Sequence, residues 1–184
     1  IDIEKDEDET LGLLFEDDGL DIKTCHNNCI FCFVDQMPKG LRSTLYVKDD
    51  DYRQSFLCGN FVTLTNLKVE RIIRYKLSPL YVSVHTMNGD LRKKMMNNRF
   101  ADKINDYLKK FAEAGIVINT QIVLVPNEND GKELDFSARE LYKLFPYVHT
   151  LAVVPCGITK YREGLYPIAD PDAEYCKSVI SQVD

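Results

Sequence analysis

Short runs of β-branched and apolar residues alternate along the chain with segments whose apolar residues recur at helical spacing. The apolar runs have the composition of strands. Most of the helical segments stop next to a glycine or a proline, as helices commonly do. Strands are predicted at residues 61–65, 80–84, 117–125 and 150–154, with a weaker one at 19–24. Helices are predicted at residues 69–77, 102–114, 134–145 and 172–183.

Strands that alternate with helices predict a parallel sheet covered by helices, which is an α/β architecture. A closed barrel of eight strand–helix units needs about 250 residues, and this chain has 184. We therefore expect an open, partial parallel β/α barrel that is truncated relative to a complete one. Residues 1–18 are expected to form an acidic lead-in, and residues 19–184 to form the core of the domain.

One loop gathers three cysteines within eight residues. Cys25, Cys29 and Cys32 stand at C-x3-C-x2-C spacing, and Phe31 precedes the last of them. Thiolates select iron–sulfur clusters, zinc or copper(I). Cubane clusters normally take four cysteines, so a three-cysteine loop leaves one iron open unless another ligand arrives from elsewhere. Open coordination positions are typical of catalytic metal sites.

Charge and the other cysteines narrow the class of protein. The net charge is −6, and the lysines and arginines are scattered, which argues against nucleic-acid binding because that requires a basic stripe. Cys58, Cys156 and Cys176 are far apart, so the cysteines do not form a disulfide framework. No apolar run approaches the length of a membrane span, and no signal peptide opens the sequence. We expect a cytoplasmic protein.

The cysteine spacing, with Phe31 at its place and strand–helix units after it, resembles the radical S-adenosylmethionine superfamily. Three longer runs resemble a little-characterised bacterial branch of it, in which a PDZ-like domain precedes the core and a domain of unknown function follows. The resemblance covers only the core of such a protein, from about Leu11 onward. The three runs are CIFCFVDQMPKG at 29–40, LYVKDDDYR at 45–53 and GNFVTLTNL at 59–67.

The resemblance implies a mechanism and its cofactors. The three cysteines would hold a [4Fe–4S] cluster, and the amino and carboxylate groups of S-adenosylmethionine would chelate the remaining iron. One electron from the reduced cluster would cleave a carbon–sulfur bond, giving methionine and a 5′-deoxyadenosyl radical that abstracts hydrogen from a substrate. The sequence does not identify that substrate, which is a small molecule or a peptide. The expected electron donor is a flavodoxin or ferredoxin.

Superfamily members bind the nucleotide at the carboxyl ends of the strands, where parallel α/β folds place their ligands. Phe31 would pack against the cluster and adenine, or fill the core beneath the loop. Asn66 stands where the superfamily has a Gly-Gly-Glu-like element, and is otherwise a turn residue. Ser83 and His85 stand where members contact the ribose and carboxylate, although a histidine at a strand end is often only a rim residue. Gln121, in mid-strand, would meet the cofactor or protein groups. No catalytic side chain is assigned beyond the cluster.

Two other functions stay open on the sequence alone. A structural zinc module would add His26, Cys58 or His85 to the three cysteines, although such sites usually pair their ligands in two short knuckles. A four-cysteine electron-transfer protein would recruit Cys58. His26, which stands between two of the cysteines, is also a candidate hydrogen-bond donor to a cluster sulfur.

Overall fold

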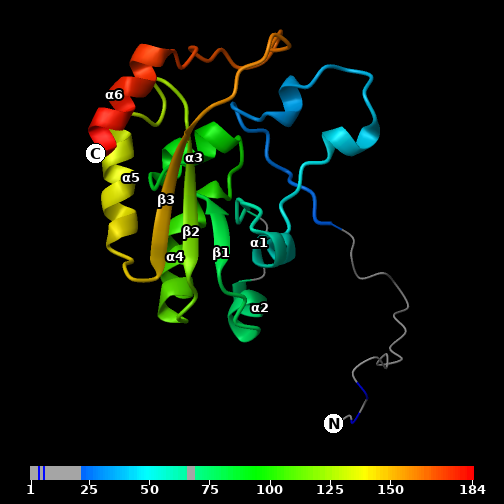
Figure 1. The fold of residues 1–184 in the computed structure, drawn as a ribbon, viewed down its shortest axis with the longest axis vertical. Helices are drawn as coiled ribbons and strands as arrows, with labels where there is room; N and C mark the ends of the chain where they lie inside the picture. Colours follow the sequence, from blue (N-terminus) through cyan, green and yellow to red (C-terminus); the bar gives the residue numbers. More distant parts are fainter. Residues whose placement is uncertain (1–3, 5, 7–21, 66–68) are drawn as a thin grey trace.

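The computed structural model describes residues 4, 6, 22–65 and 69–184. A sheet of three parallel strands lies at its centre, with helices beside it (Figure 1). The arrangement confirms the α/β prediction and the open parallel sheet. In spatial order the strands are β1 (Leu80–Ser83), β2 (Ile118–Leu124) and β3 (Val148–Pro155).

The helices connect and cover these strands. Four of them, α2, α4, α5 and α6, lie where the apolar periodicity predicts helices; each is shorter than predicted, and α5 also begins earlier. The α-helices are α1 (Tyr52–Cys58), α2 (Val69–Arg74), α3 (Gly89–Met96), α4 (Ile104–Glu113), α5 (Lys132–Tyr142) and α6 (Ala173–Val183). The 3₁₀ turns are η1 (Val34–Gln36), η2 (Ser43–Tyr46) and η3 (Ala101–Lys103).

The predicted strand at 61–65 is reduced to a single bridge, in which Val62 pairs with Val82 in parallel. The next acceptor of the ladder, the Ser83 carbonyl, is bound instead by the Arg92 guanidinium at 2.8 Å. Leu64 then takes a positive φ of 58°, which extended backbone does not allow. Of the weak strand predicted at 19–24, the described residues 22–24 contain only one isolated antiparallel bridge, from Thr24 to Asp49. Residues 19–21 lie outside the described residues.

Helix α3 was not predicted, although its ends carry recognisable signals. The Asn88 side chain caps the first turn by accepting from the Leu91 N–H at 3.3 Å. Asn97 ends the helix in the left-handed region, with φ of 46°, a conformation that asparagine tolerates better than most residues. Charged residues interrupt the apolar spacing within α3, and they obscure its period. One of them, Arg92, is buried.

Helices cover the more buried face of β2 and leave the other face for the site. Ile118, Ile122 and Leu124 are buried on the covered face. They pack in clusters with α4 and with α5 and α6, and each fully buried aliphatic side chain stabilises the fold by about 1.5–3 kcal/mol. The alternate β2 residues are less buried, and one of these, Val123, lines the cavity described below.

Candidate metal centre at the cysteine loop

Cys25, Cys29 and Cys32 line one cavity of about 420 Å³, which we call the cysteine cavity. The cysteine loop (residues 25–32) forms one wall. The carboxyl ends of all three strands form another, as expected for a ligand site in a parallel α/β fold. In Figure 1 the segment that carries the cysteines lies beyond these strand ends. The residues that the strand ends contribute are Ser83, His85, Val123, Pro155 and Gly157.

The carboxyl end of α3 anchors the backbone of the loop. The N–H groups of Asn28 and Ile30 donate to the Met96 and Met95 carbonyls at 3.1 and 2.9 Å. The last carbonyls of a helix have no partner within the helix, so the loop satisfies them while it places Cys29 between the two contacts. The position of the loop therefore depends on α3, a helix that the apolar periodicity does not predict.

A second anchor joins the loop to the segment after β3. Gln36 is fully buried, and its amide donates to the Cys32 carbonyl at 3.3 Å and the Gly157 carbonyl at 3.1 Å. Its Oε1 accepts from the Thr159 N–H at 3.1 Å. Arg162 adds a hydrogen bond to the Ile30 carbonyl at 3.3 Å. Residues far apart in the sequence therefore hold the loop in place.

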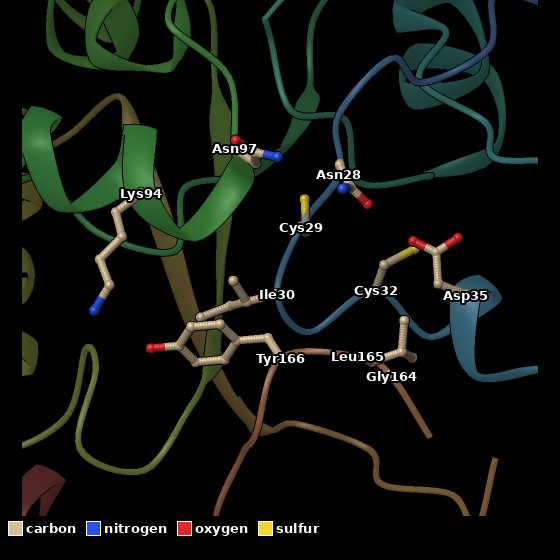
Figure 2. A pocket seen from close by; sticks show the side chains of 10 residues that line it. All are labelled: Asn28, Cys29, Ile30, Cys32, Asp35, Lys94, Asn97, Gly164, Leu165 and Tyr166. Atoms are coloured by element: carbon tan, nitrogen blue, oxygen red, sulfur yellow. The ribbon is translucent and has the colours of Figure 1, made fainter. Parts of the chain in front are cut away.

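A second hollow, of about 350 Å³, touches the same loop (Figure 2). Cys29 and Cys32 line both cavities. Lys94 from α3 and Tyr166 from the segment after β3 also line the second hollow. Lys94 is paired with Glu128, at 2.6 Å between Nζ and Oε2. The loop is therefore accessible from more than one direction.

The cysteines fit a metal centre in donor type, and all three line one cavity. All three are free thiols on one loop. Burial raises the pKa of Cys25 and raises that of Cys29 to about 12, where the neighbouring sulfurs Cys25 and Cys32 add to the effect. A bound cation reverses this cost, because metals bind thiolates and lower thiol pKa values. Among the described residues, no group of three or more Cys, His, Asp or Glu side chains lies close enough together to hold a metal ion as it stands.

A buried arginine lies behind the cavity. The Arg92 side chain is 1 % exposed, and burial lowers its pKa to about 10 while the charges of Cys29 and Asp50 raise it, so it is charged at neutral pH. In the part of the chain that the structure describes, no carboxylate forms an ion pair with it. Its guanidinium donates instead to the carbonyls of Val84, Ala101, Thr63 and Ser83, at 2.7, 2.7, 2.8 and 2.8 Å.

His85 is held as a neutral hydrogen-bond donor. Its Nδ1 accepts from the Val123 N–H at 3.3 Å, so the proton resides on Nε2. Burial and the nearby charge of Arg92 lower its pKa to about 3. Its ring centroid lies 4.6 Å from that of Phe31. His85 also has a positive φ of 63°, and such conformations cluster at functional sites.

The structure brings six of the predicted site residues together. Gln121 is not one of these six. Its carbonyl accepts from the Val84 and His85 N–H groups, but its side chain is not among those that line the cysteine cavity. Its cofactor contact stays a prediction, and Asn66 lies outside the described residues. The six that line the cavity are Cys25, Cys29, Cys32, Phe31, Ser83 and His85.

Asn27, Asn129 and Arg92 have roles in the site that the sequence analysis does not predict. His26 is exposed, and the donor to the Cys25 sulfur is the adjacent Asn27. The Asn129 amide donates to the His85 carbonyl at 2.7 Å and so supports the strained histidine. The sequence does not indicate that Arg92 is buried, because charged residues are normally exposed.

Cys58 does not complete the site in the described part of the chain. It is exposed at the end of α1 and is not among the residues that line the cysteine cavity. Within that same part, no helix is long and apolar enough to cross a membrane.

Comparison with known proteins identifies the family of the chain. No curated protein matches the chain. The sequence model of one family, described as a radical SAM-like domain, where SAM is S-adenosylmethionine, matches residues 5–151. That match spans most of the chain, including the cysteine loop and the ends of β1 and β2 that line the cavity, while the end of β3 at Pro155 lies beyond it. The chain therefore belongs to the family of radical SAM-like domains.

Proposed function

We propose that this protein is a radical S-adenosylmethionine enzyme, in which Cys25, Cys29 and Cys32 hold a [4Fe–4S] cluster and leave one iron for the nucleotide. The observation that carries the proposal is the placement of three free thiols on one cavity at the strand ends. Membership of the radical SAM-like family supports it. The exposed position of Cys58 favours three protein ligands over four.

When bound, the cluster supplies the electron that cleaves a carbon–sulfur bond of S-adenosylmethionine. The chain contributes binding, orientation and exclusion of water. Phe31 and Val123 give the cavity apolar walls beside the cysteines. The neutral His85 and the Ser83 hydroxyl offer hydrogen bonds to polar groups of a nucleotide at the same wall. Gln121 and Asn66 stay candidates for further contacts.

A charged pair stands at another part of the cavity. Lys48 lines it and lies 2.6 Å from the Asp35 carboxylate, and its ammonium also faces the Cys32 thiol. A cation at this place favours anionic groups, whether on the cluster or on a ligand. We include in the proposal a small-molecule or peptide substrate, and an electron donor of the flavodoxin or ferredoxin type. A cytoplasmic location suits the free thiols.

The test is reductive cleavage of S-adenosylmethionine. The protein is loaded anaerobically with iron and sulfide, reduced and incubated with the nucleotide, and the products are quantified by mass spectrometry. We expect methionine and 5′-deoxyadenosine from the wild type and from Cys58→Ala. A protein that carries a reducible cluster but forms neither product would contradict the proposal.

A further inference from the structure

Asn27 lies within the cysteine loop with its side chain buried, at 5 % exposure, and all its polar atoms paired. Its Nδ2 lies 3.2 Å from the Cys25 sulfur and 2.9 Å from the Thr63 hydroxyl oxygen. Its Oδ1 accepts from Asn98 Nδ2 at 2.6 Å and from the Thr65 hydroxyl at 3.1 Å. An amide has two donor hydrogens and two acceptor lone pairs, so these four contacts use its full capacity.

The orientation of the Asn27 amide follows from a chain of obligatory donors. The Phe100 main-chain N–H donates to Asn98 Oδ1 at 2.9 Å, and a main-chain N–H can only donate. The Nδ2 group of Asn98 must therefore point toward Asn27, and the Asn27 Oδ1 accepts the hydrogen bond. The Nδ2 group of Asn27 is then left facing Cys25. This reasoning fixes the amide orientation, which distances alone do not distinguish.

The other side of Asn27 gives the same orientation. The Thr63 hydroxyl donates its single hydrogen to the Asp50 carboxylate at 2.7 Å, so Thr63 accepts from Asn27 rather than donating to it. The Asn27 main-chain N–H also points to the Cys25 sulfur, at 3.4 Å. The sulfur of Cys25 thus receives two donors from one residue, and the network holds the side-chain donor in place.

We propose that Asn27 is a positioning residue that raises the reduction potential of the iron–sulfur cluster by donating hydrogen bonds to the Cys25 sulfur. This inference rests on the proposed function, since it requires the cluster. Reduction adds negative charge to the cluster and its sulfur ligands, and donors that face those sulfurs stabilise the reduced form. Loss of the Nδ2 donor should therefore make the cluster harder to reduce.

The experiment compares two substitutions of Asn27 with the same substitutions of its neighbour. Asn27→Ala removes the side-chain donor. Asn27→Asp keeps an acceptor for Asn98 and Thr65, and so preserves most of the network, but turns an oxygen toward the Cys25 sulfur. Asn28 is exposed on the same loop, which makes Asn28→Ala and Asn28→Asp matched controls. The midpoint potential of each loaded protein is measured by redox titration of the paramagnetic signal of the reduced cluster, without nucleotide.

We expect the midpoint to become more negative in the order wild type, Asn27→Ala, Asn27→Asp. At the wild-type midpoint potential, fewer than half of the clusters in either Asn27 variant would be reduced. Asn28→Ala should stay at the wild-type value, and Asn28→Asp should shift less than Asn27→Asp because its charge is screened by solvent. A residue that only supports the fold would change cluster content and leave the midpoint of the remaining clusters unchanged.

Two failures are distinguishable. If the wild type and all variants carry clusters with one common midpoint, the role of Asn27 is wrong while the proposed function stands. If the wild type takes up no iron, the proposed function itself is wrong, and this inference falls with it. If Asn27→Ala does not fold, Asn27→Asp decides the outcome by the same titration.

Discussion

Replacing Cys29 with alanine should abolish cluster assembly in the anaerobically reconstituted protein. Cys29 lies between the two backbone contacts to the carboxyl end of α3 and lines both cavities of the loop (Figure 2). Loss of a supporting residue around a metal typically costs about 10–100-fold in affinity. Loss of one of only three sulfur ligands should cost at least about 100-fold on the same scale. Bound iron and the visible absorption of the purified protein measure the effect.

Cys58→Ala is the matched control for this substitution. Cys58 is exposed at the end of α1, away from the residues that line the cysteine cavity. We expect its iron content and absorption spectrum to equal those of the wild type. Iron that survives in Cys29→Ala but is lost in Cys58→Ala would show that Cys58, and not Cys29, is a ligand of the cluster.

The second large effect is expected from Arg92→Met, measured as the free energy of unfolding in urea. The guanidinium joins the carbonyls of segment 61–65, the end of β1 and η3 through four hydrogen bonds. Hydrogen bonds to charged groups contribute about 1.5–3 kcal/mol each, and the relief of no longer burying a charge offsets part of their loss. We expect destabilisation of about 4 kcal/mol, which is a large share of the 5–15 kcal/mol typical of a domain.

Arg99→Met is the control for Arg92→Met, since it makes the same chemical change at an exposed position close by. Surface substitutions of this kind usually change stability by less than about 0.5 kcal/mol. Arg92→Lys should fall between them, because an ammonium carries charge but cannot reach four carbonyls in the fixed geometry of a guanidinium. Equal stability of Arg92→Met and Arg99→Met would contradict the structural role assigned to Arg92.

Local patterns predicted the parts of this protein that depend on neighbours in the sequence. The apolar runs of β1, β2 and β3 and the period of α4 are such patterns, as is the spacing of the three cysteines. The assignment of His85 also came from sequence, because a residue that directly follows a parallel strand lies at the ligand rim whatever else surrounds it.

The failures involve contacts between distant residues. Residues 61–65 have the composition of a strand, yet the ladder ends where Arg92 binds the Ser83 carbonyl and Leu64 takes a positive φ. Arg92 is charged in a short helix whose period is weak, and only the fold shows that four carbonyls surround it. In the sequence Asn27 is an ordinary polar loop residue. The orientation of its amide is set by Asn98 and Phe100, some 70 residues later in the chain.

The central claim is that the cysteine loop leaves one iron open to S-adenosylmethionine. The most direct measurement is the paramagnetic resonance spectrum of the reduced, loaded protein with and without that nucleotide. We predict a brown protein whose reduced spectrum shifts when the nucleotide is added, because the nucleotide becomes a ligand of the cluster. A colourless zinc protein, or a reduced cluster whose spectrum ignores the nucleotide, would contradict the account.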